Sequence, residues 1–322
     1  MLYALLGLAI AVFLIAFACY YRAFYAAPRK ATPPGTFSFP EGNIYEPYHE
    51  AMRRWTVETR AMPFKKFHIR SHDGLDLYGK FYEFAPGAPV EIMFHGYRGN
   101  AERDLSGGVQ RCFKLGRSCL LVDQRCSGKS GGRTITFGIR EHKDCLRWAE
   151  FAAKRFGPET KLILTGISMG AATVLMAAGH PLPENVIGVL ADCSYSSPRE
   201  IIRLEIKKMR LPPALSYPFV KLGARLFGGF DPDSYSPMEA VKNATVPIIF
   251  FHGQTDHFVP CSMSQALYEA CSAKKCLVTV PDAGHGLSYP KAPEAYLAAV
   301  REFFGPEASY AQGNLLDGIG KM

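Results

Sequence analysis

The sequence predicts an α/β fold in which a mostly parallel central sheet has an antiparallel hairpin at its start, helices on both faces and an inserted helical cap. Six short apolar runs, each followed by a helical pattern, indicate buried parallel strands joined by helices. Before them, two alternating segments flank Asp73-Gly74, which is a hairpin signal. About fifty residues separate the fourth run from the fifth, too many for a simple crossover, and they predict the cap.

The chain begins with twenty residues, Leu2 to Tyr21, that contain no charge. As a helix they would span about 30 Å, the thickness of a bilayer core, and Tyr20, Tyr21 and Tyr25 would form an aromatic belt. We expect residues 1–27 to be a transmembrane anchor. The alternatives are a cleaved signal peptide, which usually has a basic start and a shorter apolar run, a lipoprotein signal ending at Cys19, and a buried soluble helix.

The charges beside this run predict its orientation. Arg22, Arg29 and Lys30 follow it and no basic residue precedes it, so the positive-inside rule places the catalytic part of the chain in the cytoplasm. The nine cysteines include no Cys-x-x-Cys pair, which fits free thiols in a reducing compartment and lacks the spacing of a zinc site. Residues 28–64, which begin with a Pro/Gly-rich stretch, are expected to be a linker.

The regular elements begin near Lys65. Lys66–Ser71 and Leu75–Phe84 predict the hairpin. The expected parallel strands are Val90–Phe94, Ser118–Asp123, Leu162–Gly166, Val186–Ala191, Val246–Phe251 and Leu277–Val280. The expected helices between and after them are Ala101–Leu115, Gly138–Phe156, Met169–Gly179, Ser262–Ala273 and Pro293–Phe304. Together they predict one catalytic domain over residues 65–304.

The long insertion predicts two cap helices, Ser197–Arg210 and Ala214–Phe227, within a cap of about residues 196–236. Residues 199–225 contain seven basic side chains and two acidic ones. This charge suggests a cap that faces anionic lipid headgroups, although a solvated helix face would have the same pattern. Residues 305–322 are Gly-rich and weakly patterned, and we expect a loosely packed tail.

Two segments match Gly-x-Ser-x-Gly, and their contexts differ. Gly166–Gly170 lies between an apolar strand and a helical pattern, so the sharp turn would expose Ser168 at a helix N-terminus, where the dipole favours negative charge. Gly128–Gly132 leads into Arg133-Thr134-Ile135-Thr136, which is not a helical pattern, and it lacks the earlier glycine of a phosphate loop. The sequence therefore predicts Ser168, and not Ser130, as the nucleophile.

A serine nucleophile needs a base and an acid that orients the base. Asp256 follows the strand that ends at Phe251, and His285 follows the last strand, so both are expected on neighbouring exit loops. Asp192 and Asp282 are alternative acids, and His252 and His257 are alternative bases. None of these alternatives combines the expected position with the order serine, acid, histidine.

An oxyanion hole needs two inward-facing backbone N–H groups. The residue after the nucleophile, Met169, would supply one. The loop after Val90–Phe94, which reads His95-Gly96-Tyr97, would supply the other from Tyr97. His95 itself is expected to have a structural role, with its side chain bonded to that loop.

Taken together, the His95-Gly96 strand exit, the Asp123-Gln124-Arg125 segment with Gly128 and Ser130, the turn around Ser168, Asp256 and His285 resemble the α/β-hydrolase superfamily. The resemblance covers about Lys65 to Phe304 and is closer to bacterial membrane-tethered hydrolases of the serine-aminopeptidase and acylglycerol-lipase-like branch. It implies an α/β-hydrolase fold and hydrolysis of esters, thioesters or amides through an acyl-enzyme. Cys126 departs from the small or aromatic residue that the family often has there.

These observations predict a serine esterase that acts on a small-molecule or lipid-like acyl ester and contacts the membrane through its N-terminal helix. A thioesterase, an acyltransferase, a peptidase and a catalytically silent membrane scaffold are the alternatives. We expect no metal or organic cofactor. The net charge of +8 is moderate, and the 48% apolar and 20% charged composition is that of a globular protein, so a nucleic-acid partner is not expected.

Overall fold

The computed structural model describes residues 1–27 and 35–310 of the 322-residue chain. Within these residues, eight strands form one sheet in the order β1-β2-β4-β3-β5-β6-β7-β8. The strands are β1 (Lys65–Arg70), β2 (Asp76–Tyr82), β3 (Val90–Phe94), β4 (Ser118–Asp123), β5 (Leu162–Ile167), β6 (Val186–Asp192), β7 (Ile248–Gly253) and β8 (Lys275–Val280). β2 pairs antiparallel with β1 and β4, and all other pairs are parallel, as the sequence predicts.

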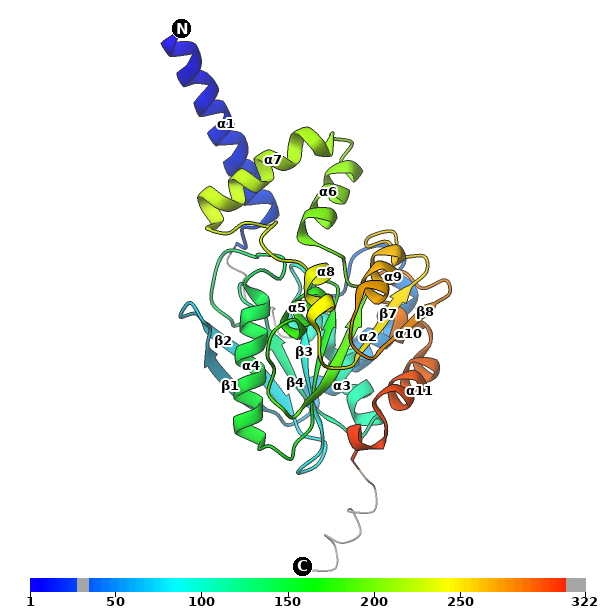
Figure 1. The fold of residues 1–322 in the computed structure, drawn as a ribbon. Helices are drawn as coiled ribbons and strands as arrows, with labels where there is room; N and C mark the ends of the chain where they lie inside the picture. Colours follow the sequence, from blue (N-terminus) through cyan, green and yellow to red (C-terminus); the bar gives the residue numbers. More distant parts are fainter. Residues whose placement is uncertain (28–34, 311–322) are drawn as a thin grey trace, which may run out of the picture.

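The helices lie on both faces of the sheet (Figure 1). One face packs against α4 (Glu141–Phe156), α5 (Met169–Ala178) and α9 (Cys261–Ala270), and the other against α3 (Ala101–Lys114) and α11 (Pro293–Phe304). Short helices α8 (Pro237–Ala240) and α10 (Ser288–Lys291) lie in connections. Because strands β3 to β7 are buried on both faces, they are almost continuously apolar, whereas the edge strand β8 is only partly buried.

The parallel register brings the functional loops to one edge of the sheet. Phe94 at the end of β3 lies opposite Val122 of β4 and Gly166 of β5. The loops that follow these strands therefore start at the same level. Ligand sites in open α/β sheets form at this carboxyl edge.

The cap consists of α6 (Pro198–Lys208), α7 (Pro213–Gly223) and a following π-helical turn, Ala224–Gly228. Figure 1 shows these helices beyond the carboxyl edge of the sheet and beside α1 (Leu2–Ala23). The N-cap Ser197 accepts a hydrogen bond from the Glu200 N–H, which explains why α6 begins there. Helix α6 lies within the expected range, and α7 begins one residue before the expected Ala214 and ends at Gly223, where the π-helical turn continues to Gly228.

The first helix, α1, is long and apolar enough to cross a membrane, with a mean hydropathy of 2.6. A signal sequence near an N-terminus can also be this long and apolar. Its first turns are exposed, whereas Ala16, Tyr20 and Phe24 are buried against the cap. Tyr20 is therefore not part of a free aromatic belt, and its hydroxyl is 2.8 Å from that of Thr134. Arg29 and Lys30, on which the expected orientation also depends, lie outside the described residues.

The segment expected to be a linker contains a packed helix, α2 (His49–Ala61). Trp55 on this helix packs against Tyr289 and lies so close to Gly107 on α3 that any side chain there would collide with it. Thr56 and Thr59 are buried on the same side. The prediction of a linker, which was based on the Pro/Gly-rich stretch before α2, did not take the amphipathic pattern of this helix into account.

The beginning of the C-terminal tail is also packed. Ala308 is fully buried, its carbonyl accepts a 2.5 Å hydrogen bond from Arg117 Nε, and the Tyr310 N–H donates to the Gly116 carbonyl at 3.0 Å. The expectation of a loose tail therefore fails for residues 305–310. Residues 311–322 lie outside the described part of the chain.

Candidate active site

Ser168 lies on the turn between β5 and α5. Its backbone is strained, with φ 56° and ψ −117°, and it is the N-cap residue of α5. The glycines two residues on either side allow this turn. A Cβ on Gly166 would collide with the Gly170 backbone, and one on Gly170 would collide with the Phe94 carbonyl. The turn thus holds Ser168 at the carboxyl edge of the sheet.

Three side chains form a continuous hydrogen-bonded chain at this edge. His285 Nε2 is 2.9 Å from Ser168 Oγ, and His285 Nδ1 is 2.7 Å from Asp256 Oδ2. The residues come from the ends of β5, β7 and β8, in the order serine, acid, histidine. The structure therefore brings together the three side chains selected from the sequence.

Asp256 is held as a carboxylate by several donors. The Phe258 and Val259 N–H groups donate to Oδ1, each at 2.8 Å. Burial by itself raises the pKa of Asp256, but the hydrogen bonds from His252, His285 and the backbone outweigh burial and hold the pKa below its usual range. A negatively charged Asp256 keeps the proton of His285 on Nδ1, so Nε2 is free to accept a proton from Ser168.

His252 is a supporting residue whose role the sequence analysis missed. Its Nε2 is 2.8 Å from the Val259 carbonyl oxygen and 3.2 Å from Asp256 Oδ2. A carbonyl partner requires a proton on Nε2, and Nδ1 is 2.7 Å from Ser264 Oγ. His252 is completely buried, so it fixes the Asp256 loop and is not the base. Its place at the end of β7, four residues before the acid, is the sequence signal.

The other acids and bases considered from the sequence lie elsewhere. Asp192 accepts a 2.8 Å hydrogen bond from Ser288 Oγ, and burial raises its pKa. Asp282 is an exposed turn residue with φ 52°. His257 is exposed on the loop after Asp256. The backbone carbonyl of Asp192 accepts from the Ser168 N–H at 2.8 Å, but among the described residues none of these three side chains is hydrogen-bonded to the side chain of Ser168 or His285.

The loop expected to complete an oxyanion hole lies over the nucleophile. A Cβ on Gly96 would lie 3.6 Å from the Cβ of Ser168. Across residues 1–27 and 35–310, no acceptor is hydrogen-bonded to the backbone N–H of Tyr97 or of Met169. Both groups are therefore available to a ligand. His95 is buried, its Nδ1 is 2.8 Å from the Gly96 carbonyl oxygen of this loop, and its Nε2 accepts from the Gln124 N–H at 3.0 Å, so its side chain is bonded to the loop as expected.

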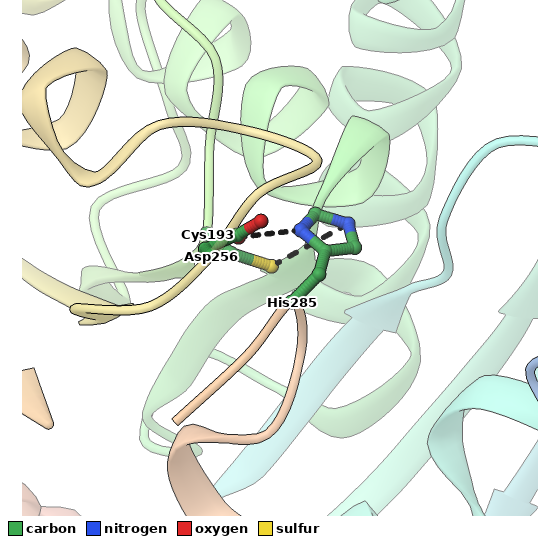
Figure 2. A group of neighbouring side chains, drawn as sticks. All are labelled: Cys193, Asp256 and His285. Carbon is green, nitrogen blue, oxygen red and sulfur yellow. Dashed lines mark hydrogen bonds and ion pairs between the residues drawn. The ribbon is translucent and has the colours of Figure 1, made fainter. Parts of the chain in front are cut away.

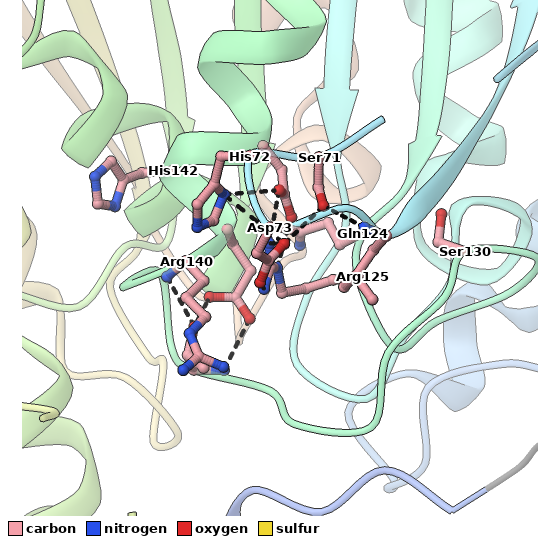
Figure 3. A network of polar contacts seen from close by, with 12 residues as sticks. Ser71, His72, Asp73, Gln124, Arg125, Ser130, Arg140 and His142 are labelled. Carbon is pink, nitrogen blue, oxygen red and sulfur yellow. Dashed lines mark hydrogen bonds and ion pairs between the residues drawn. The ribbon is translucent and has the colours of Figure 1, made fainter. Parts of the chain in front are cut away.

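The second Gly-x-Ser-x-Gly segment has a structural role. Ser130 Oγ donates to the Asp123 carbonyl at 2.5 Å and accepts from the Tyr78 N–H at 2.9 Å. Beside it, Arg125 makes paired hydrogen bonds to Asp144, at 2.6 and 2.7 Å, and to Asp73, at 3.0 and 3.1 Å (Figure 3). These contacts attach the β1–β2 turn to α4 and to this loop.

Two groups of side chains are spaced closely enough to hold a metal ion. In the first, Cys193 Sγ is 4.0 Å from His285 Nε2, and Cys193 lies beside Asp256 (Figure 2). Burial raises the pKa of Cys193 well above its usual value, so its thiol stays protonated and is a poor ligand. In the second, His72, Asp73 and Asp144, the guanidinium of Arg125 already neutralises both carboxylates.

Two cavities meet at Ser168. The larger one, about 820 Å³, is bordered by charged and polar side chains that include Arg98, Arg103, Asp104 and Lys208. The smaller one, about 470 Å³, lies between the cap and α1 and is mostly apolar. Ser168, Tyr97, Arg98 and Phe258 border both cavities. The site therefore offers two compartments that meet at one hydroxyl; both have mostly apolar walls, and the larger one has more charged and polar groups at its border.

The fold and this site define an α/β hydrolase, and the alpha/beta hydrolase family matches residues 92–299. Because the match covers more than half of the chain, the protein belongs to this family. Among curated proteins, it is 29% identical over 240 residues to the uncharacterized protein YqkD of Bacillus subtilis, covering 74% of this chain and 78% of YqkD. It is 25% identical over 271 residues to YfhR of Escherichia coli K12, covering 81% and 82%.

Solved structures of esterases have the same fold. The Pyrococcus furiosus esterase Pf2001 superposes with a TM-score of 0.63 at 22% identity, covering 84% of this chain and 98% of that one. Est1E from Butyrivibrio proteoclasticus, solved with ferulic acid bound, superposes with a TM-score of 0.57 at 21% identity, covering 79% and 100%. At these identities the likeness concerns the fold.

Proposed function

We propose that this protein is a serine hydrolase that cleaves carboxylic esters through Ser168, His285 and Asp256. The observation that carries the proposal is the hydrogen-bonded chain from Asp256 through His285 to Ser168 Oγ, at the junction of two cavities. Structural neighbours that are esterases support the ester class.

In this mechanism His285 Nε2 takes the proton of Ser168 as Oγ attacks the ester carbonyl. The N–H groups of Tyr97 and Met169 stabilise the negative oxygen that develops. The alcohol leaves with the proton from His285, and an acyl-enzyme remains. Water, deprotonated by His285, then releases the acid and restores the free serine. Asp256 stabilises the imidazolium in both steps.

The test is hydrolysis of p-nitrophenyl esters and labelling by a fluorophosphonate probe, which needs an activated serine. The wild type should hydrolyse the ester and be labelled, and Ser168→Ala should do neither. Ser130→Ala is the matched control because it removes the serine of the other motif, and it should retain both. Turnover by Ser168→Ala would contradict the assignment. Comparison of esters with thioesters and of water with alcohol acceptors separates an esterase from a thioesterase or an acyltransferase.

We further propose that residues 1–27 anchor the catalytic domain, about residues 65–304, to a membrane. The apolar, exposed first turns of α1 support this proposal. The full-length protein should stay in the membrane pellet after alkaline carbonate extraction and keep its N-terminal residues in mass spectrometry. A shortened N-terminus would indicate a signal sequence. A cytoplasmic catalytic domain should be protected from protease in intact cells.

A further inference from the structure

The smaller cavity is bordered by the end of α1 as well as by the cap. Cys19 and Ala23 from α1 face Ile202, Ile206 and Val220 of the cap helices across it, and Ser168 lies at its inner end. Three charged residues, Arg22, Arg98 and Glu205, also border it. An N-terminal helix that served only as a tether would not need to form part of the site.

Helix α1 is attached firmly to the cap. A Cβ on Gly223 of α7 would collide with the carbonyl of Ala16, so the two helices are in backbone contact. Phe227 of the π-helical turn packs edge-on against Phe13 and Phe17, with ring centroids 5.1 Å apart in both pairs. These contacts make α1 and the cap one packed unit.

The end of α1 is also bonded to the loop beside the nucleophile. The Tyr97 hydroxyl donates to the Ala23 carbonyl at 2.7 Å. The Arg98 guanidinium donates to the carbonyls of Arg22 at 2.8 Å and Tyr25 at 3.1 Å. The backbone of the expected oxyanion loop is thus positioned by the same helix end that borders the apolar cavity.

Exposed apolar side chains surround this region of the cap. Met209 and Leu211, which border the cavity, are 48% and 46% exposed, and Leu215 and Leu226 are 69% and 56% exposed. Figure 1 shows α1 crossing α7 and extending beyond the cap. The exposed, uncharged turns of α1 therefore begin beside these exposed apolar side chains of the cap.

We propose that the cavity between α1 and the cap binds the acyl chain of an ester lipid that enters from the bilayer around α1. This rests on the proposed function. The acyl carbonyl lies at Ser168, the chain extends between α1 and α6, and the alcohol portion occupies the larger cavity, which has the charged groups Arg103, Asp104 and Lys208 at its border. Ser168 displaces the alcohol, which leaves with the proton from His285, and water then releases the fatty acid. Helix α1 is both the anchor and a wall of the site.

The first test measures chain-length preference with the full-length protein in detergent micelles. In the wild type, kcat/KM for p-nitrophenyl esters should rise about fourfold for each added methylene from acetate until the cavity is filled. Cys19→Trp would place an indole in the cavity, and the ratio of decanoate to acetate kcat/KM should fall on the order of tenfold or more. Ala18→Trp is the matched control because Ala18 is an exposed neighbour on α1 that does not border the cavity, and the ratio should not change.

The second test identifies the source of the ester. The protein is reconstituted in phosphatidylcholine vesicles that contain dioleoylglycerol, whose two chains keep it in one bilayer. A parallel sample mixes protein-containing vesicles with separate vesicles that hold the dioleoylglycerol. Entry from the bilayer predicts release of oleic acid only when protein and lipid share a membrane. Equal release in both samples, or none in either, overturns entry from the bilayer.

Failure of the acyl cavity differs from failure of the proposed function. A wild type that hydrolyses acetate but shows no rise with chain length, or a Cys19→Trp ratio equal to that of the wild type, overturns the acyl cavity and leaves the esterase. A wild type that hydrolyses no ester and resists the fluorophosphonate probe overturns both.

Discussion

The two Gly-x-Ser-x-Gly turns of this protein have the same pattern and different structures. In Gly128–Gly132 the flanking glycines have the positive φ angles, 53° and 107°, and Ser130 does not. In Gly166–Gly170 the serine has the positive φ angle, and the glycines are needed because backbones pass close to them. The pattern therefore describes small residues around a serine and does not by itself specify a nucleophile.

The hydroxyl groups of the two serines differ in the same way. Ser130 Oγ is used in two hydrogen bonds to backbone groups. Ser168 Oγ is bonded to the imidazole of His285 and borders two cavities. One serine closes a loop, and the other is placed for reaction. Substitutions in and around the two turns test this difference.

The largest effect is expected from the carboxylate associated with each serine, which is Asp256 for Ser168 and Asp123 for Ser130. Asp256→Asn should lower kcat about 10⁴-fold, because an amide cannot hold His285 in the reactive tautomer, as in the serine protease series. Asp123 accepts hydrogen bonds from the Ala101 and Lys129 N–H groups. Asp123→Asn should lower the melting temperature and leave kcat close to wild type. Steady-state kinetics with a p-nitrophenyl ester and thermal melting measure both variants. A large loss of kcat in Asp123→Asn with little loss in Asp256→Asn would contradict these roles.

The next effect concerns glycine. Gly170→Ala should destabilise the fold by on the order of 3 kcal/mol, because its Cβ would collide with the Phe94 carbonyl and backbone must move. Gly131→Ala in the other turn should have little effect, since the nearest atom to its Cβ is the Asp76 carbonyl oxygen at 3.4 Å. Thermal melting of both variants measures the loss of stability, and equal losses would argue against tight packing of the turn around Ser168.

A smaller effect is expected from Ser130→Ala. The substitution leaves the Tyr78 N–H without its partner, so the free energy of unfolding should fall by about 1–2 kcal/mol. Because Ser130 takes no part in the reaction, kcat/KM should be retained. Denaturant titration measures the loss of stability. A variant as stable as the wild type would show that water replaces the hydroxyl.

The smallest effect is a pH dependence at the Arg125 network. Partial burial raises the pKa of Asp73, but hydrogen bonds from Arg125 and Ser71 outweigh it and hold the pKa below its usual range. The resulting stabilisation is present above the unfolded pKa of about 3.9 and is lost as the pH falls toward the folded value. Between pH 7 and pH 3, the wild type should lose more thermal stability than Asp73→Asn, by less than about 1 kcal/mol because the Asp73 carboxylate is partly exposed to solvent, although Arg125 is buried. Parallel loss in both proteins would contradict this.

Charge in the cap shows a limit of local sequence analysis. The basic excess in residues 199–225 suggested a strongly positive cap. In the structure, Asp231 and Asp233, just after the cap helices, pair with Lys221 and Arg225, and Glu205 pairs with Lys208. The charge is therefore partly neutralised by residues that a window ending at Arg225 does not include.

Elements with a strong local pattern could be predicted from the sequence, and the strands Val90–Phe94 and Ser118–Asp123 have the expected bounds. Side-chain alternation and apolar runs are local properties, so they can be recognised without knowledge of the fold. Helix α2 was missed because its stability depends on the contacts of Trp55 with α3 and Tyr289. The role of His252 was missed because a buried partner of an acid cannot be distinguished from an alternative base by position alone.

The sequence by itself determined the order of strands and helices, the family resemblance and the selection of Ser168, Asp256 and His285, because strand-end motifs in a parallel sheet converge on one edge. Only the tertiary structure showed that Ser130 Oγ is used in hydrogen bonds to backbone groups, and that α1 packs on the cap and bonds to the Tyr97 loop. The Tyr78–Ser130 and Ala23–Tyr97 bonds join residues more than fifty positions apart. They depend on shape and backbone approach, which no local pattern records.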